Sequence, residues 1–237
     1  MAQLVVALDV ATPEDAERLI DELYDLDVIY KVGMEALYGY SDRIFAYMEA
    51  RDVRHFIDAK LHDIPRTVAA AVTQLVRHGT HIINVHALGG REMMRVAVEA
   101  ANERARDLGS SPPHVLAVTV LTSLAESDLN DVGLAGDSLH NVVRLSRLAH
   151  ESGCSGVVCS AHEVQDVKAA LGSDFITLTP GIRPAGADTA DQKRITTPSQ
   201  AVRAGSDYVV VGRPITEAAN PLDVARTILE EMSCQPR

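Results

Sequence analysis

Two aspartates and a lysine stand close together in the segment Asp58-Ala59-Lys60-Leu61-His62-Asp63. Asp58 and Lys60 are two residues apart, so within a strand their side chains point to the same face. A lysine flanked by carboxylates is favoured in its ammonium form. Such a lysine is an acid rather than a nucleophile. The segment therefore predicts proton donation beside a developing carbanion and argues against a Schiff-base mechanism.

Further charged residues accompany two other apolar runs of the chain. Asp9 comes directly after the first run, and Lys31 lies within the second. A surface ion pair is the commoner explanation of any one Asp/Lys pair. That explanation weakens if the three runs are adjacent parallel strands, because all of these side chains then meet at one edge. We expect Asp9, Lys31, Asp58, Lys60 and Asp63 to form one charged cluster.

A second group of residues has the composition of a phosphate site. Gly212 and Arg213 follow the last apolar run. Glycine permits close approach of the backbone to an anion, and the guanidinium offers a forked donor. Arg183 and Gln192 lie in the long connection 181–197, whose polar residues could close over a ligand. From the connection alone, a surface loop with incidental arginines is an equally good interpretation.

Other polar residues carry weaker signals. Ser123 lacks the G-x-S-x-G context of a hydrolase nucleophile, so a hydrogen bond to a substrate is the better interpretation. His86 ends an apolar run, where a histidine more often has a structural role. No second His or Glu completes a metal-ligand pattern with it, and we therefore predict no metal site.

These residues need a scaffold that brings many strand ends together. The chain alternates short, β-branched apolar runs with longer segments of helical spacing, in eight units. The predicted strands are residues 4–8, 28–32, 53–59, 81–86, 115–121, 156–159, 175–179 and 208–211. The predicted helices are residues 13–25, 41–50, 65–78, 91–108, 139–152, 161–171, 198–204 and 222–232.

Eight consecutive βα units predict a closed (β/α)8 TIM barrel that forms one domain over residues 1–237. An open, doubly wound sheet is the alternative. Its dinucleotide-binding form usually places G-x-G-x-x-G after the first strand, whereas here Asp9-Val10-Ala11-Thr12-Pro13 follows. Active sites of such barrels lie at the C-terminal ends of the strands, where the residues above are expected.

The composition excludes several classes of partner. The 237 residues carry 22 Lys+Arg and 33 Asp+Glu, and the net charge of −11 disfavours nucleic acid and anionic membranes as partners. Cys154, Cys159 and Cys234 show no C-x-x-C spacing, which argues against disulfides and a thiolate metal site. Because neither a signal sequence nor a membrane-length apolar run is present, we expect a cytoplasmic protein.

At these residues the chain resembles the orotidine 5′-phosphate decarboxylase family from end to end. The family signature Asp-x-Lys-x-x-Asp-Ile-x-x-Thr runs from Asp58 to Thr67, with Arg66 at a position that is often Asn in the family. The other family-like segments are ALDV at 7–10, KVG at 31–33, VHALGG at 85–90, LTS at 121–123, TPGIRP at 179–184, DQKR at 191–194 and VGRPI at 211–215. Each segment is weak by itself, and their combination in this order is highly specific.

The resemblance implies decarboxylation of orotidine 5′-monophosphate (OMP) to UMP, the last step of UMP synthesis, without metal or cofactor. Lys60 would donate a proton to C6 within a network of Asp58, Asp63 and Lys31. Asp63 and Thr67 would enter the partner's site in a homodimer. The implied substrate contacts are Asp9 and Lys31 at the ribose, Thr122 and Ser123 at the pyrimidine, Arg183, Gln192, Gly212 and Arg213 at the phosphate, and Pro180.

Two other functions stay open. A metal-dependent sugar-phosphate lyase or decarboxylase, such as hexulose-phosphate synthase, has a related barrel and resembles this chain around Asp-x-Lys-x-x-Asp. It needs Mg²⁺ and an enediolate. The TPGIRP, DQ and LTS segments favour the pyrimidine enzyme. A non-catalytic barrel that binds a phosphorylated ligand is less favoured, because the lysine and both aspartates are present.

Overall fold

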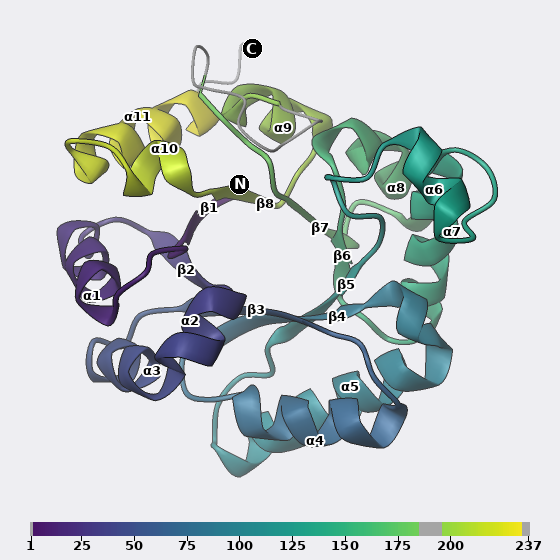
Figure 1. The fold of residues 1–237 in the computed structure, drawn as a ribbon, viewed down its shortest axis with the longest axis horizontal. Helices are drawn as coiled ribbons and strands as arrows, with labels where there is room; N and C mark the ends of the chain where they lie inside the picture. Colours follow the sequence, from purple (N-terminus) through teal and green to yellow (C-terminus); the bar gives the residue numbers. More distant parts are fainter. Residues whose placement is uncertain (1, 185–195, 234–237) are drawn as a thin grey trace.

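A computed structural model describes residues 2–184 and 196–233 of the chain. Strands β1 to β8 are parallel and close into a barrel in which each strand pairs with the next and β8 pairs with β1 (Figure 1). The helices surround this ring of strands. The predicted (β/α)8 barrel is confirmed, and the open-sheet alternative is wrong.

The elements have the following bounds. The strands are β1 Gln3–Ala7, β2 Val28–Val32, β3 His55–Leu61, β4 Thr80–His86, β5 His114–Val118, β6 Gly156–Val158, β7 Ile176–Thr179 and β8 Tyr208–Val211. The α-helices are α1 Pro13–Glu22, α2 Met34–Gly39, α3 Ser41–Ala50, α4 Pro65–Leu75, α5 Gly90–Asp107, α6 Glu126–Asp131, α7 Ser138–Glu151, α8 Val164–Leu171, α9 Pro198–Ala204, α10 Arg213–Thr216 and α11 Pro221–Ser233. Two 3₁₀ turns, η1 Ala87–Gly89 and η2 Ala161–Glu163, precede α5 and α8.

The predicted elements are all present, with ends that differ by a few residues. β5 ends at Val118 instead of residue 121, and η2 occupies the first turn of the helix predicted from residue 161. The short helices α2, α6 and α10 are not anticipated by the sequence pattern. They are four to six residues long, which is too short for an apolar stripe of helical period to develop.

Local capping fixes where several helices begin. Thr12 accepts a hydrogen bond from the backbone N–H of Asp15 at 3.2 Å at the start of α1. Asp137 accepts one from His140 N–H at 2.7 Å at the start of α7. Such caps satisfy N–H groups that have no partner within the helix. These two side chains therefore define the first turns of α1 and α7.

Alternation along the strands separates two apolar layers. One fills the barrel interior, and its members include Ile29, Phe56 and Ile82. The other packs the outer faces of the strands against the helices. Because side chains two residues apart share a face, the positions two residues further along also face the interior. These positions are Lys31, Asp58 and Asn84, all less than one-tenth exposed.

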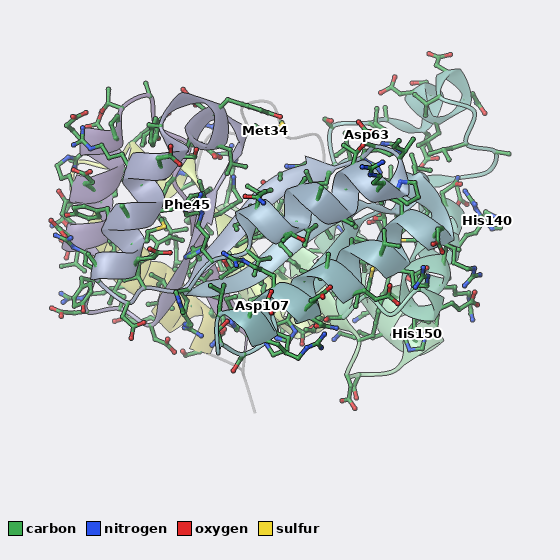
Figure 2. The ribbon with its side chains drawn as sticks, turned by 90° about the horizontal axis from the view of Figure 1, so that it is seen from below. Met34, Phe45, Asp63, Asp107, His140 and His150 are labelled. Carbon is green, nitrogen blue, oxygen red and sulfur yellow. The ribbon has the colours of Figure 1, made fainter. Side chains whose placement is uncertain are left out.

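The barrel therefore has two distinct ends. Its upper rim is formed by the C-terminal ends of the strands and its lower rim by their N-terminal ends. In Figure 2, Met34 and Asp63, which follow β2 and β3, lie along the upper edge, whereas Asp107 and His150, at the ends of α5 and α7, lie toward the lower edge. Within residues 2–184 and 196–233, no helix is long and apolar enough to cross a membrane.

Candidate active site

A cavity of about 710 Å³ lies at the upper rim. It brings together most of the predicted site residues: Asp9, Lys31, Asp58, Lys60, Thr122, Ser123, Pro180, Arg183, Gly212 and Arg213. Asp63 and Thr67 do not line it, and both are exposed on the segment that leads into α4. Gln192 lies outside the described residues.

Charged side chains on the first three strands form a continuous chain of alternating sign. Lys31 Nζ lies 2.8 Å from Asp9 Oδ1 and 3.3 Å from Asp58 Oδ2. Lys60 Nζ donates to the other oxygen, Asp58 Oδ1, at 2.7 Å. The Asp58 carboxylate is thus shared between two lysines, one on each oxygen.

The two lysines of this charged series differ in the exposure of their side chains. The side chains of Lys31 and Asp58 are 9% and 11% exposed, so their charges depend on one another for stabilisation. The Lys60 side chain is 32% exposed, and its ammonium is accessible from the cavity. Both lysines line the cavity, and Lys60 is the more exposed of the two.

Electrostatic coupling keeps the buried pair ionised. Burial alone would lower the pKa of Lys31, but the neighbouring charges of Asp58 and Asp9 outweigh it and raise that pKa. Burial would likewise raise the pKa of Asp58, and the charges of Lys31 and Lys60 hold that pKa below its ordinary value. The Asp58 carboxylate and the Lys31 ammonium therefore stay ionised beside Lys60 at neutral pH.

The backbone at Lys60 departs from the regular strand assumed in the sequence argument. Ile57 pairs with Ile83 and Leu61 with Val85, so residues 58–60 of β3 lie opposite Asn84 alone. Lys60 has a φ of +48°, in the left-handed region that side-chain-bearing residues rarely adopt. Asp58 and Lys60 meet as predicted, but they do so across a bulge and not along an uninterrupted strand.

Gly33 leaves room for the Asp9–Lys31 pair. A Cβ at this position would lie 2.6 Å from Asp9 Oδ1 and 2.9 Å from Lys31 Nζ, so the carboxylate or the ammonium would have to move. The KVG segment thus supplies both the lysine and the space in which its partner carboxylate reaches it.

Basic residues line the opposite part of the cavity, after β7 and β8. Arg183 is only 8% exposed, and its Nε is buried without a hydrogen-bond partner in the described structure. Its own backbone N–H donates to Thr196 O at 3.1 Å, which ties the two ends of the connection together. Arg213 is exposed at the start of α10. Such a buried, unsatisfied guanidinium nitrogen is suited to an anion.

The loop after β5 contributes the neutral polar lining of the cavity. Thr122 is half-buried and Ser123 is exposed, in the segment between β5 and α6. Glu126 at the start of α6 accepts hydrogen bonds from Ser138 N–H at 3.1 Å. This contact links the loop to the start of α7.

Two histidines stack beside the charged chain. The rings of His62 and His86 are 5.2 Å apart and inclined by 22°. Burial, together with the charges of His62 and Lys60, lowers the pKa of His86 to about 4, so that His86 is neutral at pH 7. In the described residues no group of three or more His, Cys, Asp or Glu side chains is placed to hold a metal. Cys154 and Cys159 are buried, and Cys234 lies outside the described residues.

Asn84 is the site residue that the sequence argument misses. Its amide contacts both Asp58 and the backbone of Lys60, although it does not line the cavity. Its location is nevertheless indicated by the sequence. Asn84 follows the interior-facing Ile82 by two residues, which places it inside the barrel near the upper rim.

Comparison with known proteins agrees with the fold and the motifs. The sequence model of the Orotidine 5′-phosphate decarboxylase / HUMPS family matches residues 2–228. Orotidine 5′-phosphate decarboxylases of Shewanella sediminis and Psychromonas ingrahamii are 46% and 44% identical over 230 residues, covering 97% of this chain and 97% of each relative. The crystal structure of orotidine 5′-phosphate decarboxylase from Lactobacillus acidophilus matches with a TM-score of 0.87 at 36% identity, over 99% of this chain and 100% of that one. The chain belongs to the orotidine 5′-phosphate decarboxylase / HUMPS family.

Proposed function

We propose that the protein is a carboxy-lyase that converts OMP to UMP in pyrimidine nucleotide synthesis. The single observation that carries the proposal is the charged series Asp9–Lys31–Asp58–Lys60 in the upper-rim cavity, with Lys60 as its more exposed cation. The names of the relatives support OMP as the substrate.

The reaction requires a cation at a defined point. Breaking the bond between C6 and the carboxylate releases CO₂ and leaves the electron pair on C6, in a ring that delocalises it poorly. A preorganised ammonium stabilises that charge as it develops. Lys60 then transfers a proton from Nζ to C6, which forms the new C–H bond, and the lysine regains a proton from solvent.

Asp58 orients the proton donor. Its Oδ1 accepts the hydrogen bond from Lys60 Nζ at 2.7 Å, and its Oδ2 is held by Lys31 at 3.3 Å. Preorganisation of this kind means that little rearrangement is needed during the reaction. We assign the ribose hydroxyls to Asp9 and Lys31, and the pyrimidine to Thr122 and Ser123.

The substrate phosphate belongs at the other side of the cavity. We assign it to Arg183, Gly212 and Arg213, with Gln192 from the connection and a contact to Pro180. The buried Nε of Arg183 supports this assignment, because a phosphate oxygen would satisfy it. Binding energy from a group remote from C6 can position the ring and so increase turnover.

Asp63 and Thr67 fit a shared site in a homodimer. Both are exposed, and Ile64 between them is 66% exposed, which is unusual for an apolar side chain beside an active site. We propose that these residues complete the site of the partner subunit. An equal mixture of inactive Lys60→Ala and Asp63→Ala chains, dissociated and reassociated, should recover about a quarter of wild-type activity. Half of the dimers are then mixed, and each mixed dimer contains one intact site. No recovery in verified mixed dimers would show that the sites are not shared.

A metal-dependent sugar-phosphate lyase is the second candidate, because the description of the matched family also names HUMPS. The deciding experiment measures CO₂ release from OMP after exhaustive chelation and without added metal. We expect full activity under these conditions. Strict dependence on Mg²⁺ with a sugar phosphate as substrate would favour the lyase, and UMP binding without CO₂ release would favour a non-catalytic barrel.

A further inference from the structure

Asn84 lies where β3 and β4 lose their regular pairing. Between the pairs Ile57/Ile83 and Leu61/Val85, three residues of β3 face this one residue of β4. The two additional residues bend β3 away from the ladder and leave its backbone groups without regular partners. Asn84 is 1% exposed at this point, so its amide has no access to solvent.

Both ends of the Asn84 amide are used within the bulge. Its Oδ1 accepts a hydrogen bond from the backbone N–H of Lys60 at 2.7 Å. Its Nδ2 donates to Asp58 Oδ1 at 2.7 Å, the same oxygen that accepts from Lys60 Nζ. One side chain thereby connects the main chain of the lysine to the carboxylate that orients its ammonium.

The backbone conformation of Lys60 is unfavourable without the hydrogen bond to Asn84. Lys60 has a φ of +48°, in the left-handed region that is unfavourable for a residue with a side chain. A buried N–H without an acceptor would add a further cost. The Asn84 oxygen supplies the acceptor that the interrupted ladder does not provide.

We propose that Asn84 is a positioning residue that sets the direction of the Lys60 side chain by fixing both its backbone and its partner Asp58. The inference rests on the proposed decarboxylation. Asn84 does not line the cavity, so its effect is on turnover and not on ligand binding. A misplacement of about 1 Å at the reacting group lowers a rate by roughly 100-fold.

Two substitutions separate the roles of the amide. Asn84→Leu removes both hydrogen bonds at similar volume, and we expect kcat to fall by roughly 100-fold while the Kd for UMP stays within about threefold. Asn84→Asp keeps the acceptor for Lys60 N–H but places a second carboxylate against Asp58. We expect a similar fall in kcat and a shift of the acidic limb of the kcat profile to higher pH, because like charges favour protonation of the carboxylate pair.

Thr80→Val is the matched control. Thr80 lies at the other end of the same strand and is 8% exposed. Its hydroxyl joins β4 to β3 through His55 Nε2 at 2.9 Å and accepts from Arg77 N–H, in the segment before β4, at 3.0 Å. This variant should lose stability without a change in kcat or in the pH profile.

The outcomes are distinguishable. Wild-type protein that releases no CO₂ from OMP would refute the proposed function, whatever the variants do. Active wild type with unchanged kcat in both Asn84 variants would overturn the positioning role. So would a fall in kcat that Thr80→Val reproduces, since Asn84 would then act only through stability. Should Asn84→Leu fail to fold, the nearly isosteric Asn84→Asp decides the question through its pH profile.

Discussion

The two rims of the barrel differ in how their polar side chains are arranged. At the upper rim, Asp58 is bound by two lysines that line a cavity, the Arg183 Nε has no described partner, and three residues of β3 lie opposite one residue of β4. At the lower rim, polar and aromatic side chains contact one another. His81 Nε2 shares a hydrogen bond with Tyr208 OH at 2.9 Å, and the ring of His114 packs edge-on against His81 at 5.3 Å.

A lysine at the lower rim makes the contrast concrete. Lys168 Nζ donates to Asp207 Oδ2 at 2.6 Å and to the carbonyls of Ser173 and Phe175 at 2.8 and 2.9 Å. Three acceptors use all three of its protons. Lys60 has one described acceptor and faces a cavity. Ion pairs thus occur at both ends of the barrel. The two rims differ in whether the lysine has N–H groups left to bind a ligand.

The largest expected effect comes from removing the more exposed lysine. Lys60→Ala should fold as a dimer and bind UMP measurably, but lose decarboxylation by at least about 10⁴-fold, because both the proton donor and the stabilising cation are gone. Steady-state CO₂ release and UMP titration measure the two quantities. Turnover close to wild type would refute the role of Lys60.

A smaller effect is expected at the phosphate side of the same rim. Arg213→Ala should lower kcat/KM for OMP by roughly 100-fold, since a charge-assisted contact to the phosphate is lost. The phosphate-free nucleoside, orotidine, should be used as poorly by the variant as by the wild type. Equal impairment with both substrates would show that Arg213 does not act on the phosphate.

At the lower rim, the same kind of change should affect stability alone. Lys168→Met removes three hydrogen bonds and leaves Asp207 without its cation, which should lower the free energy of unfolding by about 2 kcal/mol. Urea denaturation measures this change, with kcat expected to stay within about twofold of wild type. A large fall in kcat in a fully folded Lys168→Met variant would contradict the assignment of catalysis to the upper rim and of stability to the lower rim.

The smallest effect is a dependence of stability on pH. Burial lowers the pKa of His55 and of His81 to about 4 from an ordinary value of 6.5. Unfolded chain therefore binds more protons than folded chain between these values. Stability is complete above about pH 6.5 and falls as the pH decreases toward 4. His55→Gln should show a shallower decrease between pH 7 and 5 in denaturation experiments. An unchanged slope would show that His55 does not contribute.

Sequence patterns account for the barrel because each strand is a short, fully apolar run between helices with their own start signals. They also locate Asp58, Lys60 and Arg213, since side chains at strand ends must meet at one rim. The bulge at Lys60 is not readable from the sequence: it depends on how β3 and β4 pair. The short helices α2 and α6 are missed because their start signals lie within loops and no apolar stripe follows.

Asn84 shows a further limit. An asparagine in an apolar strand predicts only a buried amide that needs partners, and which partners it finds depends on the neighbouring strand. The roles of Asp63 and Thr67 show another limit of prediction from sequence. Their place in the proposed site depends on a second chain, which the spacing of residues within one chain does not reveal.

Gly33 also determines how the Asp9–Lys31 pair would respond to a substitution beside it. A Cβ at this position would lie within 3 Å of both the Asp9 carboxylate and the Lys31 ammonium, so one of these groups would have to move. The close neighbours are the ends of side chains and not backbone atoms. A small side chain at position 33 would therefore change the geometry of the Asp9–Lys31 pair and leave the backbone in place.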